Sequence, residues 1–205
     1  MRGARPLPWG VGLALSLVVV GCGSSVPVSP QASSSPAGTS HFAAPGIAFD
    51  YPAAWNATQL DTQFHYETVV GLLGSGQFAE ACPSDAQPGQ MNTCTERVSL
   101  SPGKVVVQVS TWQLPTPAGM SQVQYQLSAD PSAAPLTVDG KRAALSQEGE
   151  PMNGADQHWL WLVDAPGSTW TAYGIEAWLR GPDADVLRAQ LDALVATMSV
   201  EAPSP

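Results

Sequence analysis

The chain has 205 residues, with 17 acidic and 8 basic side chains and a formal net charge of −9. So few Lys and Arg side chains argue against nucleic-acid binding and against electrostatic binding to anionic lipid, because both need clusters of basic residues. The length predicts one domain with a sizeable hydrophobic core.

The N-terminus has the layout of an export signal. Arg2 and Arg5 precede an apolar stretch at residues 11–20, which ends in Gly21-Cys22 and a Ser/Pro-rich run. About 20 apolar residues are needed to cross ~30 Å of hydrocarbon, so this stretch is too short to span a bilayer. We therefore expect residues 1–21 to be a signal peptide.

The end of this stretch, Val19-Val20-Gly21-Cys22, resembles the lipobox of bacterial lipoproteins. The resemblance implies that the Cys22 thiol carries diacylglycerol, that cleavage occurs before Cys22, and that the new amine is acylated with a fatty acid such as palmitate. The alternative is an ordinary secretory signal with an incidental cysteine. Cleavage would leave 17 acidic against 6 basic side chains, a charge of −11. Acyl chains, at ~0.8 kcal/mol per buried CH₂, would then anchor the protein outside the cell membrane.

Residues 22–44 are rich in Ser and Pro, which is typical of an extended linker without a core of its own. His41, near the end of this segment, is expected to be a solvated linker residue. We expect the folded domain to begin at Pro45 and to extend over residues 45–200, followed by a tail at 201–205.

The domain is predicted to begin with a half-buried strand at 46–51, because Ile47, Phe49 and Tyr51 alternate with Ala48 and Asp50. This strand followed by Tyr-Pro-x-x-Trp resembles the start of PsbP-like domains, including those of LpqN- and LpqT-type actinobacterial lipoproteins. The resemblance implies an α+β fold, an α/β/α sandwich around a mostly antiparallel sheet. It also implies a binding or assembly role.

A second strand is expected from about residue 66 to 73, followed by Gly74-Ser-Gly76. These glycines and Ala79 match the spacing of a dinucleotide fingerprint. However, Cys82-Pro83 would cut the following helix short, and no βαβ unit follows. We therefore interpret the segment as a loop.

Cys82 and Cys94 remain as an even pair once Cys22 is lipidated. In an exported protein they predict a disulfide, which would stabilise the turn-rich segment between them by roughly 3 kcal/mol. The rival interpretation, a reactive or metal-binding pair, lacks both a CxxC spacing and a nearby histidine.

The next elements are predicted from periodicity and turn residues. Strands are expected at 97–100 and 104–112 around Ser-Pro-Gly-Lys, a turn that also matches the S-x-x-K motif of penicillin-binding proteins but lacks its helix and partner motifs. Met120, Val123 and Leu127 predict a short helix between residues 117 and 131. Asp139-Gly140 predicts a hairpin at 135–146, whose Val-Asp-Gly-Lys-Arg-Ala sequence also resembles PsbP-like domains.

The last third predicts two long strands, 158–164 and 168–179, and a helix from about Asp183. Odd-numbered residues 173–179 should face one side, and Trp170, Gly174, Glu176 and Trp178 the other. The helix carries one apolar stripe that should cover one face of the sheet: Leu187, Leu191, Leu194, Val195 and Met198.

The tryptophans are the main ligand candidates. Trp170 and Trp178 are predicted to share a face, joined by Trp159 and Trp161 or by His158 according to the strand register, as a wall for an apolar or sugar-like ligand. The alternative is that the helix at 117–130 covers this wall, in which case replacing Trp170 would unfold the domain.

Catalysis has little support in the sequence. The three histidines are scattered, His65 and Glu67 read as a solvated strand edge, and no catalytic motif, metal-ligand cluster or obvious carboxylate pair is present. We expect no catalytic residue, metal or cofactor, and a membrane-anchored binding or interaction domain whose partner is a protein or an apolar ligand. The alternative is an unrecognised cell-envelope enzyme.

Overall fold

The computed structural model describes residues 38–76, 100–149 and 154–203. The predicted signal peptide, the lipidated Cys22, the Cys82–Cys94 disulfide and most of the strand predicted at 97–100 lie outside these residues. So does most of the predicted linker. No helix in the described ranges is long and apolar enough to cross a membrane.

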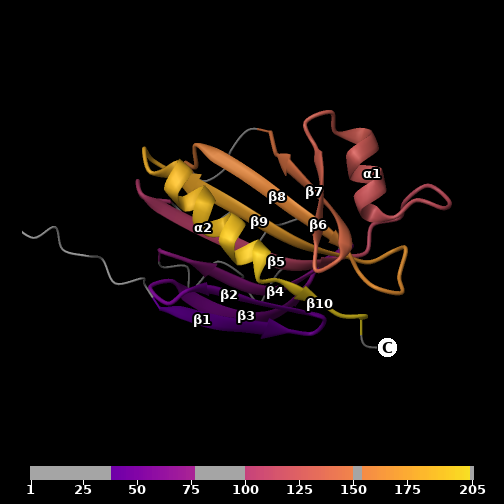
Figure 1. The fold of residues 1–205 in the computed structure, drawn as a ribbon, viewed down its shortest axis with the longest axis horizontal. Helices are drawn as coiled ribbons and strands as arrows, with labels where there is room; N and C mark the ends of the chain where they lie inside the picture. Colours follow the sequence, from indigo (N-terminus) through magenta and orange to yellow (C-terminus); the bar gives the residue numbers. More distant parts are fainter. Residues whose placement is uncertain (1–37, 77–99, 150–153, 204–205) are drawn as a thin grey trace, which may run out of the picture. The chain divides into compact units, whose positions relative to one another are not determined.

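Seven antiparallel strands form the main sheet, in the order β3-β4-β5-β9-β8-β7-β6 (Figure 1). Its strands are β3 (Asn56–Gln63), β4 (Glu67–Gly74), β5 (Lys104–Trp112), β6 (Ala134–Val138), β7 (Lys141–Gln147), β8 (Gln157–Asp164) and β9 (Ala172–Arg180). A smaller sheet has the order β1-β2-β10, with β1 (Thr39–Ala44), β2 (Ile47–Pro52) and β10 (Ser199–Val200).

The main sheet is covered by different elements on its two faces. Helix α2 (Ala184–Ala196) and the small sheet pack on one face, in a continuous hydrophobic core that includes Trp161, Tyr173 and Leu191 (Figure 1). Helix α1 (Gln122–Ala129) packs on the other face over β7 and β8, where Val123 contacts Leu160 and Leu162. The structure thus confirms the α+β class, with a mostly antiparallel sheet between helices.

Most of the predicted elements are present. Strand β2 corresponds to the strand predicted at 46–51, β4 to the one predicted from about 66 to 73, and β5 to the one predicted at 104–112. The predicted hairpin around Asp139-Gly140 is formed by β6 and β7. Asp139 and Gly140 both have positive φ, +48° and +70°, as a two-residue type I′ turn requires. The predicted apolar stripe is buried throughout, although its last member, Met198, lies just beyond the end of α2.

Several elements differ from the prediction. Residues 39–44, expected to be linker, form β1, which pairs along its whole length with β2. Strand β3 had no clear apolar alternation and was not predicted, because most of its side chains are exposed at the sheet edge. Met120 precedes α1 and is exposed, so only Val123 and Leu127 of the predicted stripe face the sheet.

Phe42 explains why β1 belongs to the folded domain. Its ring is 3% exposed and stacks on Phe49 with a centroid distance of 5.0 Å. It also lies directly over Gly71 of β4, where an added Cβ would come within 2.4 Å of the ring. A glycine at this position therefore allows the small sheet to pack closely on the main sheet.

We predict that Phe42→Ala lowers the free energy of unfolding by about 3–5 kcal/mol, because it removes a buried ring and leaves a cavity. The measurement is chemical denaturation monitored by tryptophan fluorescence. His41→Ala is the matched control, since the neighbouring His41 side chain is exposed, and it should change stability little. Equal stabilities for the two variants would mean that residues 39–44 behave as a linker.

Candidate functional site

A row of polar side chains crosses the centre of the main sheet on the face that carries α1. Gln108 and Glu176 are direct partners in the β5–β9 register, and His158 is the partner of Trp178 in the β8–β9 register. Cross-strand partners point to the same face of a sheet, so Gln108, Glu176 and His158 share this face. Glu67 of β4 joins them through hydrogen bonds.

The Gln108 amide links the two carboxyl groups. Its Nε2 donates to Glu67 Oε1 at 2.8 Å and lies 3.3 Å from both Glu176 Oε2 and Ser110 Oγ. Ser110 Oγ also donates to Glu67 Oε1, at 2.5 Å. Gln108, Ser110 and Glu176 are buried, so this network is removed from bulk water.

Burial decides the protonation of the carboxyl groups. Burial, with smaller contributions from the Glu67 and Glu148 carboxylates, raises the pKa of Glu176 to about 8. Burial also raises the pKa of Glu67, and this effect is opposed by the hydrogen bonds from Ser110 and Gln108. Glu176 therefore holds its proton at neutral pH.

His158 is uncharged at the same pH. Its ring stacks on Trp178 with a centroid distance of 4.5 Å, and burial lowers its pKa to about 4. His158 Nε2 lies 3.9 Å from Glu176 Oε1, which is too long for a hydrogen bond. Because the histidine is neutral and Glu176 is protonated, this contact joins two neutral groups and is not an ion pair.

Glu67 also lines a small pocket at one end of the polar row. The turn between β3 and β4 supplies one side of the pocket, and the end of β5 and the following residues supply the other. The pocket has a volume of about 30 Å³. Its lining residues are Phe64, His65, Tyr66, Glu67, Trp112 and Leu114.

Backbone hydrogen bonds hold the two sides of this pocket together. Phe64 N donates to Glu67 O at 2.7 Å and closes the β3–β4 turn, while Gln113 N donates to Tyr66 O at 2.8 Å. The Trp112 indole lies over Gly174 of β9, where an added Cβ would be 2.7 Å from Trp112 Nε1. Any larger residue at position 174 would displace this ring.

The four predicted ligand-binding tryptophans do not form one wall. Trp178 is fully buried on the polar face, whereas Trp161 is 1% exposed on the α2 face, with Trp159 beside it. Arg188 of α2 lies over both of these rings, 3.9 Å from the centroid of Trp159 and 4.9 Å from that of Trp161. The strand register thus places His158, and not Trp159 or Trp161, beside Trp178.

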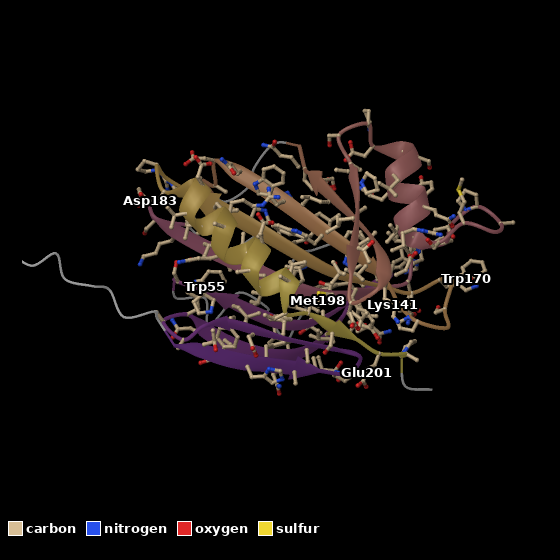
Figure 2. All side chains as sticks on the ribbon, in the orientation of Figure 1. Trp55, Lys141, Trp170, Asp183, Met198 and Glu201 are labelled. Atoms are coloured by element: carbon tan, nitrogen blue, oxygen red, sulfur yellow. The ribbon has the colours of Figure 1, made fainter. Side chains whose placement is uncertain are left out.

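Trp170 lies outside the sheet. We expected it in a strand beginning at 168, but β9 begins at Ala172. Ser168 Oγ accepts hydrogen bonds from Trp170 N and Thr171 N, which holds these residues in a turn. The Trp170 side chain is 58% exposed and points away from the domain (Figure 2), so its replacement should not unfold the protein.

The carboxyl pair was missed because its members are 109 positions apart in the sequence. Glu67 was interpreted as part of a solvated edge, which was wrong because β4 lies between β3 and β5. The available signal was a polar residue within an otherwise buried strand, as with Gln108 among the valines of β5 and Glu176 in β9. In the described ranges, no group of three or more His, Cys, Asp and Glu side chains could hold a metal.

We predict that Glu176→Gln flattens the pH dependence of stability between pH 6.5 and 8. The unfolded state loses the Glu176 proton near pH 4.5 and the folded state near pH 8, so the wild type loses stability as the pH rises through this range, by on the order of 1 kcal/mol per pH unit. His158 acts in the opposite direction, but only below pH 6.5.

The measurement is urea denaturation at half-unit pH intervals. Asp61→Asn, which changes an exposed carboxyl on β3, is the control and should keep the wild-type slope. A Glu176→Gln variant with the wild-type slope would contradict a buried, protonated Glu176.

No protein-family model and no curated protein matches the sequence. Among the solved structures that are similar to the chain are the following two. One is a protein of Bacteroides thetaiotaomicron VPI-5482, with a TM-score of 0.44 and 14% identity, covering 78% of this chain and 48% of that chain. The other is cyanobacterial PsbP (CyanoP) from Synechocystis sp. PCC 6803, with a TM-score of 0.44 and 9% identity, covering 85% of this chain and 99% of that chain. This chain thus spans about half the length of the Bacteroides protein and nearly all of CyanoP.

Proposed function

We propose that this chain is a membrane-anchored cell-envelope lipoprotein whose domain binds a ligand without catalysing a reaction. The lipid anchor would be attached at Cys22, after removal of residues 1–21. The observation that carries the binding role is the pocket at the β3–β4 turn. It combines an apolar, aromatic lining with one partly buried carboxyl group, Glu67.

This composition supports a binding role. Small-molecule sites are concave and mostly apolar, with a few polar groups that fix the orientation of the ligand. Here Phe64 and Trp112 provide apolar surface, Tyr66 is 39% exposed at the rim, and Glu67 is the polar group. Glu67 is itself held by Ser110 and Gln108, so it is oriented before a ligand arrives.

The positions of the titratable side chains favour binding over the alternative of an envelope enzyme. A carboxyl group with a raised pKa is suited to general acid catalysis, but a general acid must come within hydrogen-bond reach of the reacting atoms. Glu176 is only 7% exposed and is not among the residues that line the pocket. His158 is stacked on Trp178 and does not line the pocket either. Glu67 does line the pocket and its pKa is raised, but its Oε1 already accepts hydrogen bonds from Ser110 and Gln108, and neither Glu176 nor His158 stands beside it in the pocket as a second acid or base.

We predict that the full-length chain, expressed in a bacterium with lipoprotein processing, fractionates with membranes and is released only by detergent. Intact mass spectrometry should give the mass of residues 22–205 plus diacylglycerol and, where the host acylates the amine, one further fatty acid. Cys22→Ser is the matched control and should have neither modification. A wild-type mass equal to that of its amino acids alone would contradict the anchor.

We predict that small organic molecules bind at the pocket. A defined library of neutral and charged fragments can be titrated into the detergent-solubilised, ¹⁵N-labelled lipoprotein, with binding followed by amide and indole chemical shifts. Binders should perturb residues 64–67 and 112–114, and they should be recovered chemically unchanged. Clustering of the shifts elsewhere on the domain, or an absence of binders, would contradict the binding role, and turnover of a fragment would favour the enzyme.

A further inference from the structure

The pocket is rich in π-electron surface and poor in positive charge. Phe64, Tyr66 and Trp112 each contribute a ring, and the His65 imidazole packs edge-on against Tyr66 with a centroid distance of 3.9 Å. The faces of aromatic rings carry negative electrostatic potential, which attracts a cation placed over them. Neither Lys nor Arg occurs among the residues that line the pocket.

Glu67 adds a carboxyl group, which carries a negative charge when it is ionised. Its two hydrogen bonds, from Ser110 and from Gln108, both fall on Oε1. Within the described part of the chain, no residue donates a hydrogen bond to Oε2. A cation in the pocket would stabilise the ionised form of Glu67 and so offset the burial that raises its pKa.

The volume limits what can enter. A cavity of about 30 Å³ holds the end of a molecule and not a whole drug-sized ligand, for which pockets of roughly 300–1,000 Å³ are usual. Only a small substituent, such as one methyl group on an ammonium nitrogen, can therefore enter, and the rest of the ligand must lie at the mouth of the pocket.

We propose that this pocket binds the ammonium group of an organic cation, with the rings of Phe64, Tyr66 and Trp112 around it and Glu67 as its counter-charge. The inference rests on the proposed binding function and specifies the chemistry of the ligand. An ammonium group is compact, its charge is attracted to ring faces, and the opposite charge of Glu67 favours it over an anion. The mature chain would carry 17 acidic and 6 basic side chains, so its overall charge also attracts cations.

The test compares choline with 3,3-dimethyl-1-butanol, a neutral molecule of nearly the same shape. Each is titrated into the full-length lipoprotein at pH 8 and constant ionic strength, and the Trp112 indole resonance and the amides of residues 64–67 report binding. We expect choline to bind at least tenfold more tightly than the alcohol. A cation–π contact with an ionic partner is worth a factor of this order.

Three variants assign the interaction to the pocket. Glu67→Gln keeps the shape and the hydrogen-bonding oxygen but removes the charge, so choline affinity should fall at least tenfold while alcohol affinity stays the same. Trp112→Leu should weaken choline by a similar factor. Trp170→Leu removes a 58% exposed tryptophan outside the pocket and is the matched control, with no expected change.

Equal affinities of the wild type for choline and the alcohol would overturn the inference, as would unchanged choline binding by Glu67→Gln. This result is separable from failure of the proposed function. If library fragments bind at residues 64–67 and choline does not, only the ammonium assignment fails. If neither binds there, both fail. The comparison of the two ligands on the wild type stands even if Trp112→Leu does not fold.

Discussion

The structure depends on the pairing of β5 with β9 at the centre of the main sheet, where both strands are buried on both faces. One face of this pair is apolar, with Val107 and Val109 packed among the residues beneath α2. The other face carries Gln108 beside Glu176. Burying a carboxylate without compensation is costly, and this network reduces the cost by keeping Glu176 protonated and by directing the Gln108 and Ser110 donors at Glu67.

The two faces of the sheet therefore have different roles. The α2 face contains the large continuous core, which includes the small sheet through Phe42 and accounts for most of the buried apolar side chains. The α1 face is divided into two smaller hydrophobic clusters, and the polar row lies on the same face. Buried polar side chains such as Gln108 and Glu176 depart from the apolar pattern of a core, and such departures are typical of functional sites, which favours this second face as the location of the candidate site.

Glu67 connects the buried network with the surface. It accepts hydrogen bonds from Ser110 and Gln108 inside the domain, and it lines the pocket formed by the β3–β4 turn and Trp112. A ligand charge placed in that pocket would therefore act on Glu67 first and through it on Glu176, whose pKa Glu67 already raises. The β4–β5–β9 part of the sheet is thus both a structural centre and the support of the candidate binding site.

Local sequence signals predict correctly the elements whose final environment agrees with those signals. The Asp139-Gly140 turn, the apolar stripe of the C-terminal helix and the alternation in β2 are each short-range signals, and all three are present. Export and lipidation at Cys22 are also predictions of the sequence, and they concern residues outside the described structure.

The other features could not be predicted from the sequence, because they depend on contacts between distant parts of the chain. Strand β1 has a linker-like sequence, but it belongs to the folded domain because the Phe42 ring packs over Gly71 and stacks on Phe49. The predicted tryptophan wall is divided because the β8–β9 register puts His158 beside Trp178 and leaves Trp161 on the opposite face. Glu67 and Glu176 come together only through β5, which lies between their strands, and no local pattern near either residue encodes that neighbour.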